Sequence, residues 1–190
     1  MELFGKTRLK IGNSILKKKL AKNSRKVSFS NLSNVRSIGV VWDASKTHDF
    51  SCLSRFFQKM HDRNIDVKIL GYYKGKELPD QYTAIRYLTC IRNNDIDLFY
   101  IPDSADTESF IKTRFDVLID INFDKLLPLK YISSLSRSGF KVGLFDSEPT
   151  EQNFDLMLEL KKPVMLDNYL DEIIHYLELI NSGSSDQKVK

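Results

Sequence analysis

The sequence predicts an α/β fold in which a mostly parallel sheet lies between helices, and three observations lead to this prediction. The segment from Phe115 to Phe145 has the pattern of strand, helix and strand in about thirty residues, the size of a βαβ unit. Similar apolar runs alternate with segments of helical spacing elsewhere in the chain. The strand-like runs are almost continuously apolar, as expected of strands that are covered on both faces. With 190 residues, 42% of them hydrophobic, the chain can bury the core of one domain.

The central unit begins with a strand over Phe115 to Ile121. We expect Asp124 to cap the next helix, which would begin near Lys125 and tolerate Pro128 in its first turn. The stripe predicted to face the sheet consists of Leu126, Leu129, Ile132 and Leu135. The side chains predicted to face water are Lys130, Ser134 and Arg137. Gly139 is expected to end this helix in a left-handed conformation, and a second buried strand follows over Phe140 to Phe145.

The chain before this unit starts with a basic helix over residues 1 to about 25, which carries Leu9, Leu16 and Leu20 on one stripe. Gly12 weakens the middle of this helix, so we expect its order to depend on a partner. The elements predicted next are a connecting or edge strand (26–32), a first strand (38–42) ending at Asp43, a helix (49–63), a second strand (66–73), a short strand around 85–91 and a short helix (107–114).

The chain after this unit is predicted to contain a loop (146–153), an edge strand (154–160), a helix that Asp167 caps and that ends near Asn181, and a frayed tail. We therefore expect a basic N-terminal arm over residues 1–36, an α/β domain over 37–182 and a disordered tail over 183–190. The domain should be a three-layer sandwich that is Rossmann-like or flavodoxin-like, preceded by the basic N-terminal helix.

Nearly the whole sequence resembles a known family. The run FIKTRFDVLIDINFDKLLPLKYISSLSRSGFKVGL from Phe110, together with the later FDLMLEL and LDEIIHYL, is similar to a family of short uncharacterised proteins from Bacteroidetes. This resemblance implies an α/β fold and a bacterial lineage, and it supplies no catalytic residues. A local stretch also resembles the N-terminal half of heptosyltransferase-type glycosyltransferases, where an aspartate lies near the end of the first strand, here Asp120.

Several function classes have no support in the sequence. Neither GxGxxG nor GxxxxGK[ST] follows any predicted strand, so no nucleotide cofactor is expected. Cys52 and Cys90 show no pairing or zinc-binding pattern. The sequence contains no membrane-spanning run and no secretion signal, so we expect a cytoplasmic protein.

Charge is distributed unevenly along the chain. Residues 1–37 contain ten Lys or Arg and one acid, whereas the rest of the chain carries 19 basic and 24 acidic residues. A basic segment attracts phosphate backbones with little sequence preference, which favours structured RNA, above all ribosomal RNA, as the partner. The predicted RNA-binding residues are Lys6, Arg8, Lys10, Lys17, Lys18, Lys19, Lys22, Arg25 and Lys26.

Two other interpretations of the basic arm stay open. Because the arm also has an apolar stripe, it could associate with an anionic membrane surface, although Phe4 is its only aromatic residue before Phe29. A charge run can also be only a solvated face.

A second candidate site consists of polar residues at the ends of predicted strands. Asp43, Asp120, Asn122 and Asp146 follow three strands, and their oxygens suit a hard cation such as Mg²⁺, which gives the hypothesis of a small metal-dependent enzyme. The alternative is that they cap helices and satisfy loop N–H groups. His48 could serve as an acid or base beside Asp43, or be a bystander. The sequence as a whole favours a non-enzymatic binding protein over an enzyme.

Overall fold

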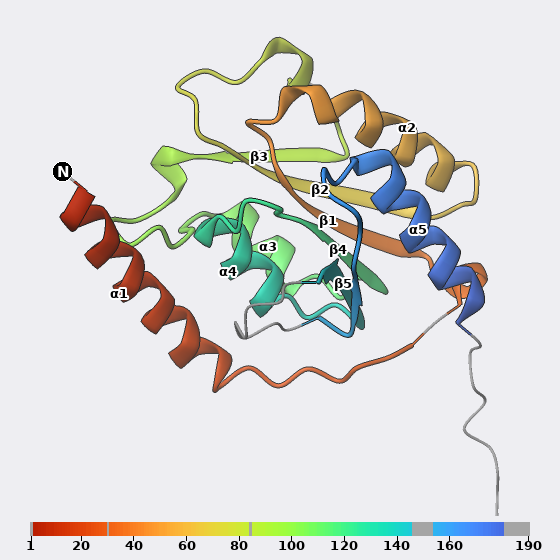
Figure 1. Ribbon diagram of the computed structural model, residues 1–190, viewed down its shortest axis with the longest axis horizontal. Coiled ribbons are helices and arrows are strands. Elements are labelled where there is room, and N and C mark those ends of the chain that lie inside the picture. Colours follow the sequence, from red (N-terminus) through yellow and green to blue (C-terminus); the bar gives the residue numbers. More distant parts are fainter. Residues whose placement is uncertain (1, 30, 84, 146–153, 181–190) are drawn as a thin grey trace, which may run out of the picture.

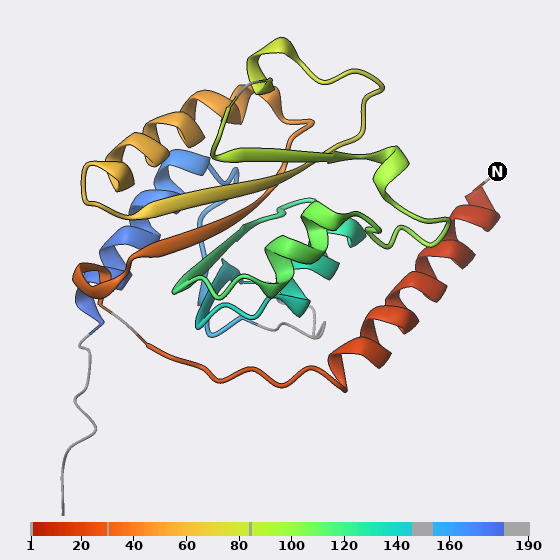
Figure 2. The same ribbon diagram turned by 180° about the vertical axis from the view of Figure 1, so that it is seen from behind.

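The computed structural model describes residues 2–29, 31–83, 85–145 and 154–180, and it contains one six-stranded sheet in which all neighbouring strands are parallel. The strands are β1 (Ser37–Asp43), β2 (Asp66–Tyr73), β3 (Leu88–Arg92), β4 (Val117–Ile121), β5 (Phe140–Leu144) and β6 (Leu156–Leu158). Their order, β3-β2-β1-β4-β5-β6, is that of the Rossmann fold, so the Rossmann-like alternative is the correct one (Figures 1 and 2).

Helices cover both faces of this sheet. They are α1 (Glu2–Leu20), α2 (Phe50–His61), α3 (Ala105–Lys112), α4 (Leu127–Leu135) and α5 (Leu166–Leu179). Helices α2 and α5 pack on one face, and α3 and α4 pack on the other. The predicted βαβ unit is therefore confirmed as β4, α4 and β5.

The continuous apolar runs of the strands follow from this double covering. In β1, Val40 and Trp42 point into the core shared with α2 and α5, while Val41 points into the core shared with α3 and α4. Side chains alternate between the two faces of a strand, so apolar residues predominate at successive positions of a strand with helices on both sides.

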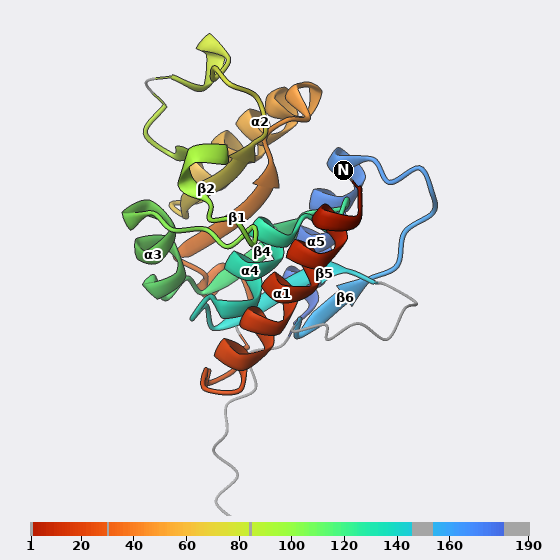
Figure 3. The same ribbon diagram turned by 90° about the vertical axis from the view of Figure 1, so that its left-hand side faces the viewer.

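Helix α1 forms an additional layer outside α4 (Figure 3). It does not pack on the sheet, because α4 lies between them. The helix itself was predicted, but its place was not, since no sequence pattern indicated a partner for it within the chain. The segment that follows, which was predicted as a possible strand over 26–32, is extended and pairs with no strand in the described part of the chain.

Two predicted helix caps are wrong. Asp124 is exposed and forms an ion pair with Lys46 at 3.1 Å, and no described side chain caps the start of α4. Asn122 Oδ1 accepts the N–H of Leu126, the residue before the helix, at 2.8 Å. Asp167 lies inside the first turn of α5 and pairs with Arg55 at 2.7 Å. In both cases a carboxylate near a helix start has an arginine or lysine of another element within reach.

The predicted end of α4 is also wrong, and of the three side chains predicted to face water Arg137 is exposed while Ser134 is not. The helix ends at Leu135, and no described glycine has a positive φ, so Gly139 is not a left-handed cap. Gly139 instead lies close to Asp116: a Cβ added to Gly139 would be 3.3 Å from the Asp116 carbonyl oxygen. Ser134 is buried, because the side of α4 expected to face water is covered by α1. The loop 146–153, Asn181 and the tail 183–190 lie outside the described residues.

Candidate nucleic-acid interface

Helix α1 is attached to the domain through apolar side chains. Leu16 is buried in a cluster with Leu127, Tyr131 and Leu135 of α4 and with Ile101. Ile15 and Leu20 pack against the edge of the same cluster. Burying this stripe stabilises α1 as a helix, which an isolated segment of this length would not achieve in water.

Gly12 allows α1 to approach the domain closely. A Cβ at this position would overlap the Phe99 carbonyl oxygen and would lie 2.7 Å from Leu127 Cδ2. The glycine that was expected to weaken the helix therefore permits the close contact between α1 and the domain.

Two of the predicted RNA-binding residues on α1 make contacts with the domain. The Arg8 Nε donates a hydrogen bond to the Leu98 carbonyl, and its guanidinium lies 4.8 Å from the centre of the Tyr100 ring. The Lys19 ammonium donates to the Tyr131 hydroxyl and lies 5.1 Å from that ring. Neither contact involves a carboxylate, so both residues keep their positive charge uncompensated at the domain surface.

Five further lysines extend into solvent, and we call them the arm lysines. They are Lys6, Lys10, Lys18, Lys22 and Lys26. All five are exposed, and none forms a hydrogen bond or ion pair through its side chain with any residue in the described ranges. Lys17 is exposed as well. The basic segment is therefore fixed in place by its apolar side while most of its charge faces outward.

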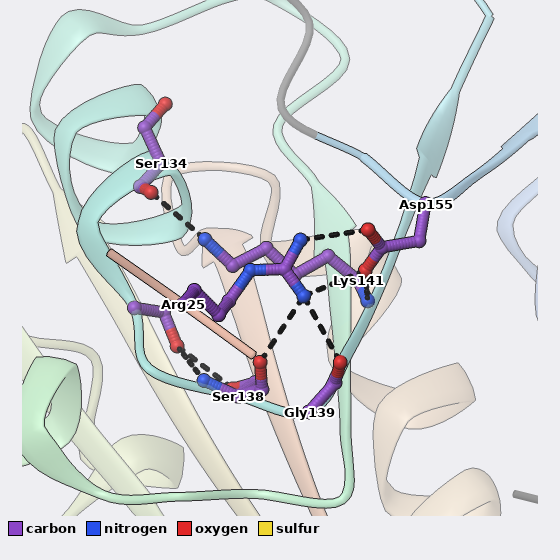
Figure 4. A network of polar contacts seen from close by, with 7 residues as sticks. Arg25, Ser134, Ser138, Gly139, Lys141 and Asp155 are labelled. Carbon is purple, nitrogen blue, oxygen red and sulfur yellow. Dashed lines mark hydrogen bonds and ion pairs between the residues drawn. The ribbon is translucent and has the colours of Figure 1, made fainter. Parts of the chain in front are cut away.

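The chain after α1 is fixed to the domain by Arg25 (Figure 4). Its guanidinium donates to both carboxylate oxygens of Asp155, at 2.8 and 2.7 Å, and to the carbonyls of Ser138 at 3.3 Å and Gly139 at 3.0 Å. The Ser28 N–H donates to the Gly139 carbonyl at 3.0 Å. This set of contacts, the Arg25 clasp, holds the segment against the turn that precedes β5.

A groove lies beside the Arg25 clasp, at the edge of the sheet where β4 and β5 begin. It has a volume of about 520 Å³, and its lining includes Lys26 and Arg25 from the arm and Arg114 and Arg137 from the domain. Arg114 and Arg137 were not among the binding residues predicted from the sequence. The signal was present, since each precedes a predicted parallel strand by one to three residues, and the starts of neighbouring parallel strands meet at one edge.

Next to the Arg25 clasp, Lys141 of β5 is almost fully buried. Its ammonium donates to the Ser134 carbonyl at 2.8 Å (Figure 4). Burial and, to a smaller extent, the positive charge of Arg25 lower the pKa of Lys141 to about 7, against the opposing influence of Asp155 and Asp120. Burial likewise raises the pKa of Asp120 to about 6.

Asp43 and Asp120 lie at the carboxyl ends of β1 and β4. These strands are neighbours, and the strand order changes direction between them, which is where ligands bind in sheets of this kind. Asp43 accepts the Ser45 N–H at 3.1 Å, and Asp120 accepts the Asn122 N–H at 2.7 Å, so both perform the loop-satisfying role that was the alternative interpretation. In the part of the chain that the structure describes, no three His, Cys, Asp or Glu side chains form a group that could hold a metal ion. Asp146 lies outside the described residues, and His48 is exposed, 3.3 Å from Asp49.

Comparison with known proteins identifies a family without an assigned activity. Within the described ranges, no helix is both long and apolar enough to cross a bilayer. No curated protein and no solved structure is significantly similar to the chain. A family model described as a family of unknown function (DUF6913) matches residues 8–180, and this match extends from α1 through α5. The chain is therefore a member of that family of unknown function.

Proposed function

We propose that this protein binds structured RNA, such as ribosomal RNA, through the arm lysines and the neighbouring basic residues of α1. The observation that supports this proposal is the orientation of α1. Its apolar side is used for docking on α4, while the arm lysines remain exposed and unpaired within the described residues. A fixed array of cations loses less conformational entropy on binding a phosphate backbone than a flexible tail does.

The same observation disfavours the membrane alternative. An interfacial helix inserts its apolar stripe into the lipid, but here Leu16 is buried against α4, with Ile15 and Leu20 at the margin of the same contact. The large apolar side chains of α1 described as exposed are Phe4 (80%), Leu9 (43%) and Ile11 (40%). That area is small compared with the apolar face of a membrane-binding helix.

The test is a substitution of all five arm lysines by Gln, with binding of a folded bacterial ribosomal RNA measured over a range of salt concentrations. We expect the variant to bind at least tenfold more weakly at low salt. The slope of log K against log salt should decrease by about 4, since each phosphate contact contributes roughly 0.9.

The matched control removes five exposed basic residues elsewhere on the domain. It replaces Lys68, Lys76, Arg86, Lys161 and Lys162 by Gln. This variant has the same net charge as the arm variant, so equal weakening by both would show a non-specific effect of charge and would refute the proposal. Retention of the wild-type protein by phosphatidylserine vesicles, without binding of RNA, would favour the membrane alternative instead.

Other predictions from the sequence carry over as proposals with less support. Attachment to a ribosomal particle and a cytoplasmic location follow from the same proposal, and a Bacteroidetes lineage follows from the sequence resemblance. The metal-dependent enzyme and the likeness to heptosyltransferases both depend on the strand ends around Asp120, where the described carboxylates are occupied by backbone N–H groups.

A further inference from the structure

The groove beside the Arg25 clasp combines basic residues from three separate parts of the chain. Lys26 comes from the arm, Arg114 from the turn before β4, and Arg137 from the turn before β5. Lys26 is placed there because its neighbour Arg25 is bound to Asp155 and because the Ser28 N–H donates to the Gly139 carbonyl. The groove therefore exists only when the arm is docked.

The cations of the groove are available for a ligand. Lys26, Arg114 and Arg137 are exposed, and their side chains have no hydrogen-bonding or ionic partner among the residues that the structure describes. Arg25 also lines the groove, but its charge is paired with Asp155 and its hydrogen bonds are used in the clasp.

The groove is also lined by one acid, Asp116, which accepts its hydrogen bonds through Oδ2 and forms no ion pair with a cation of the groove within the described residues. The Asp116 carboxylate accepts hydrogen bonds from the backbone N–H groups of Arg36 at 2.8 Å and Ser37 at 2.9 Å, and from the Ser37 hydroxyl at 3.2 Å. Ser24 and Ser28 add further polar groups to the lining. A volume of about 520 Å³ is within the range of ligand sites, but this lining suits an anion rather than an apolar molecule.

We propose that this groove is a phosphate-binding site in which Arg114 and Arg137 are the principal ligands and Lys26 and the serine hydroxyls assist. Guanidinium groups bind phosphate with paired hydrogen bonds, so a groove lined by two unpaired arginines suits phosphate. That the phosphate belongs to the RNA backbone rests on the proposed function, whereas the capacity of the groove for phosphate does not. On RNA, the groove continues the track of the arm lysines from α1 onto the domain.

The experiment uses the full-length protein with Arg114→Gln and Arg137→Gln together. Both side chains are exposed, so we expect the variant to fold normally, and its thermal unfolding verifies this. Binding of the folded ribosomal RNA should weaken about tenfold at low salt, and the salt slope should fall by about 2. A control variant with Arg86→Gln and Arg92→Gln loses the same amount of positive charge at another part of the surface. This control should bind RNA like the wild type.

A second probe, inorganic pyrophosphate, tests the groove without RNA. Titration of the ¹⁵N-labelled protein should shift the amide signals of Ser28, Arg137 and Gly139, and these shifts should be absent from the double variant. Pyrophosphate shifts without RNA binding by the wild type would refute the proposed function and support a free phosphorylated ligand for the groove. Normal RNA binding by the double variant, with no pyrophosphate shifts in the wild type, would refute the groove while leaving the function of the arm lysines intact.

Discussion

Gly12 shows how one residue can decide the position of a whole helix. In an isolated helix, glycine is less favourable than alanine by about 1 kcal/mol. In this protein its missing side chain lets α1 lie directly on the Phe99 carbonyl and on Leu127. Gly5, in the same helix, has no atom within 4 Å of where its Cβ would be, so the two glycines have opposite expected effects on substitution.

We expect Gly12→Ala to lower the free energy of unfolding by about 1 to 3 kcal/mol, because the added methyl group meets a backbone oxygen that cannot move aside easily. Gly5→Ala should instead raise it, by up to about 1 kcal/mol, through helix propensity alone. Urea unfolding of both variants measures the difference. Equal stabilisation by the two substitutions would contradict the close docking of α1.

Lys141 makes stability depend on pH. Its pKa is about 7 in the folded protein and near 10.5 in an unfolded chain, so the unfolded state binds more protons between these values. Stability must then increase as the pH rises through this window. From pH 7 to 8.5 we expect a gain of about 1 to 2 kcal/mol, measured by urea unfolding at a series of pH values.

The Lys141→Met variant tests the assignment of this pH dependence. Without the ammonium, the increase in stability between pH 7 and 8.5 should disappear, while the fold is retained because methionine fills most of the same volume. Asp120 has the opposite effect on stability at lower pH. Because its pKa is raised to about 6, the folded state binds more protons than the unfolded state below that pH, so stability falls as the pH rises from about 4 to about 6. An unchanged slope in Lys141→Met would assign the effect to another group.

At the scale of elements, α4 is the helix for which sequence reasoning was least accurate. Of the stripe predicted to face the sheet, Leu129 and Ile132 do so and Leu126 packs at its edge, whereas Leu135 does not. Its other apolar residues, Leu127, Tyr131 and Leu135, face α1. A periodic pattern indicates which positions are apolar, but a helix covered on two sides has two apolar stripes, and the pattern does not identify the second partner.

The Arg25 clasp joins the arm to β5 and β6, and its strength depends on burial. The side chains of Arg25 and Asp155 are only 15% and 11% exposed, whereas those of Arg55 and Asp167, at the same distance of 2.7 Å, are 62% and 59% exposed. A double-mutant cycle with Arg25→Gln and Asp155→Asn should give a coupling energy of about 1 to 3 kcal/mol. The same cycle on the exposed pair should give a clearly smaller coupling energy.

The measurement is chemical unfolding of the wild type, the two single variants and the double variant of each pair. The coupling of the exposed pair should also decrease at higher salt, while that of the clasp should change little. Similar coupling energies for both pairs would mean that the clasp does not hold the arm more firmly than a surface ion pair does.

At the scale of the molecule, local patterns predicted the elements and the fold class, but not the contacts between distant segments. The apolar runs of β1, β2, β4 and β5 were sufficient to predict a covered parallel sheet, because each strand carries its own signal. The basic character of the arm was likewise visible in its composition. The place of α1, the partner of Arg25 and the meeting of Arg114 with Arg137 depend on pairings across the whole chain, which no local pattern contains.

The docking of α1 on α4 has a consequence for the order of events during synthesis. Lys19 and its partner Tyr131 are 112 residues apart, so the ribosome makes α1 early and its docking surface much later. At 5–20 residues per second, this delay lasts roughly 5 to 20 s. Throughout that time the nascent cationic segment has no docking surface within its own chain, and it emerges beside ribosomal RNA.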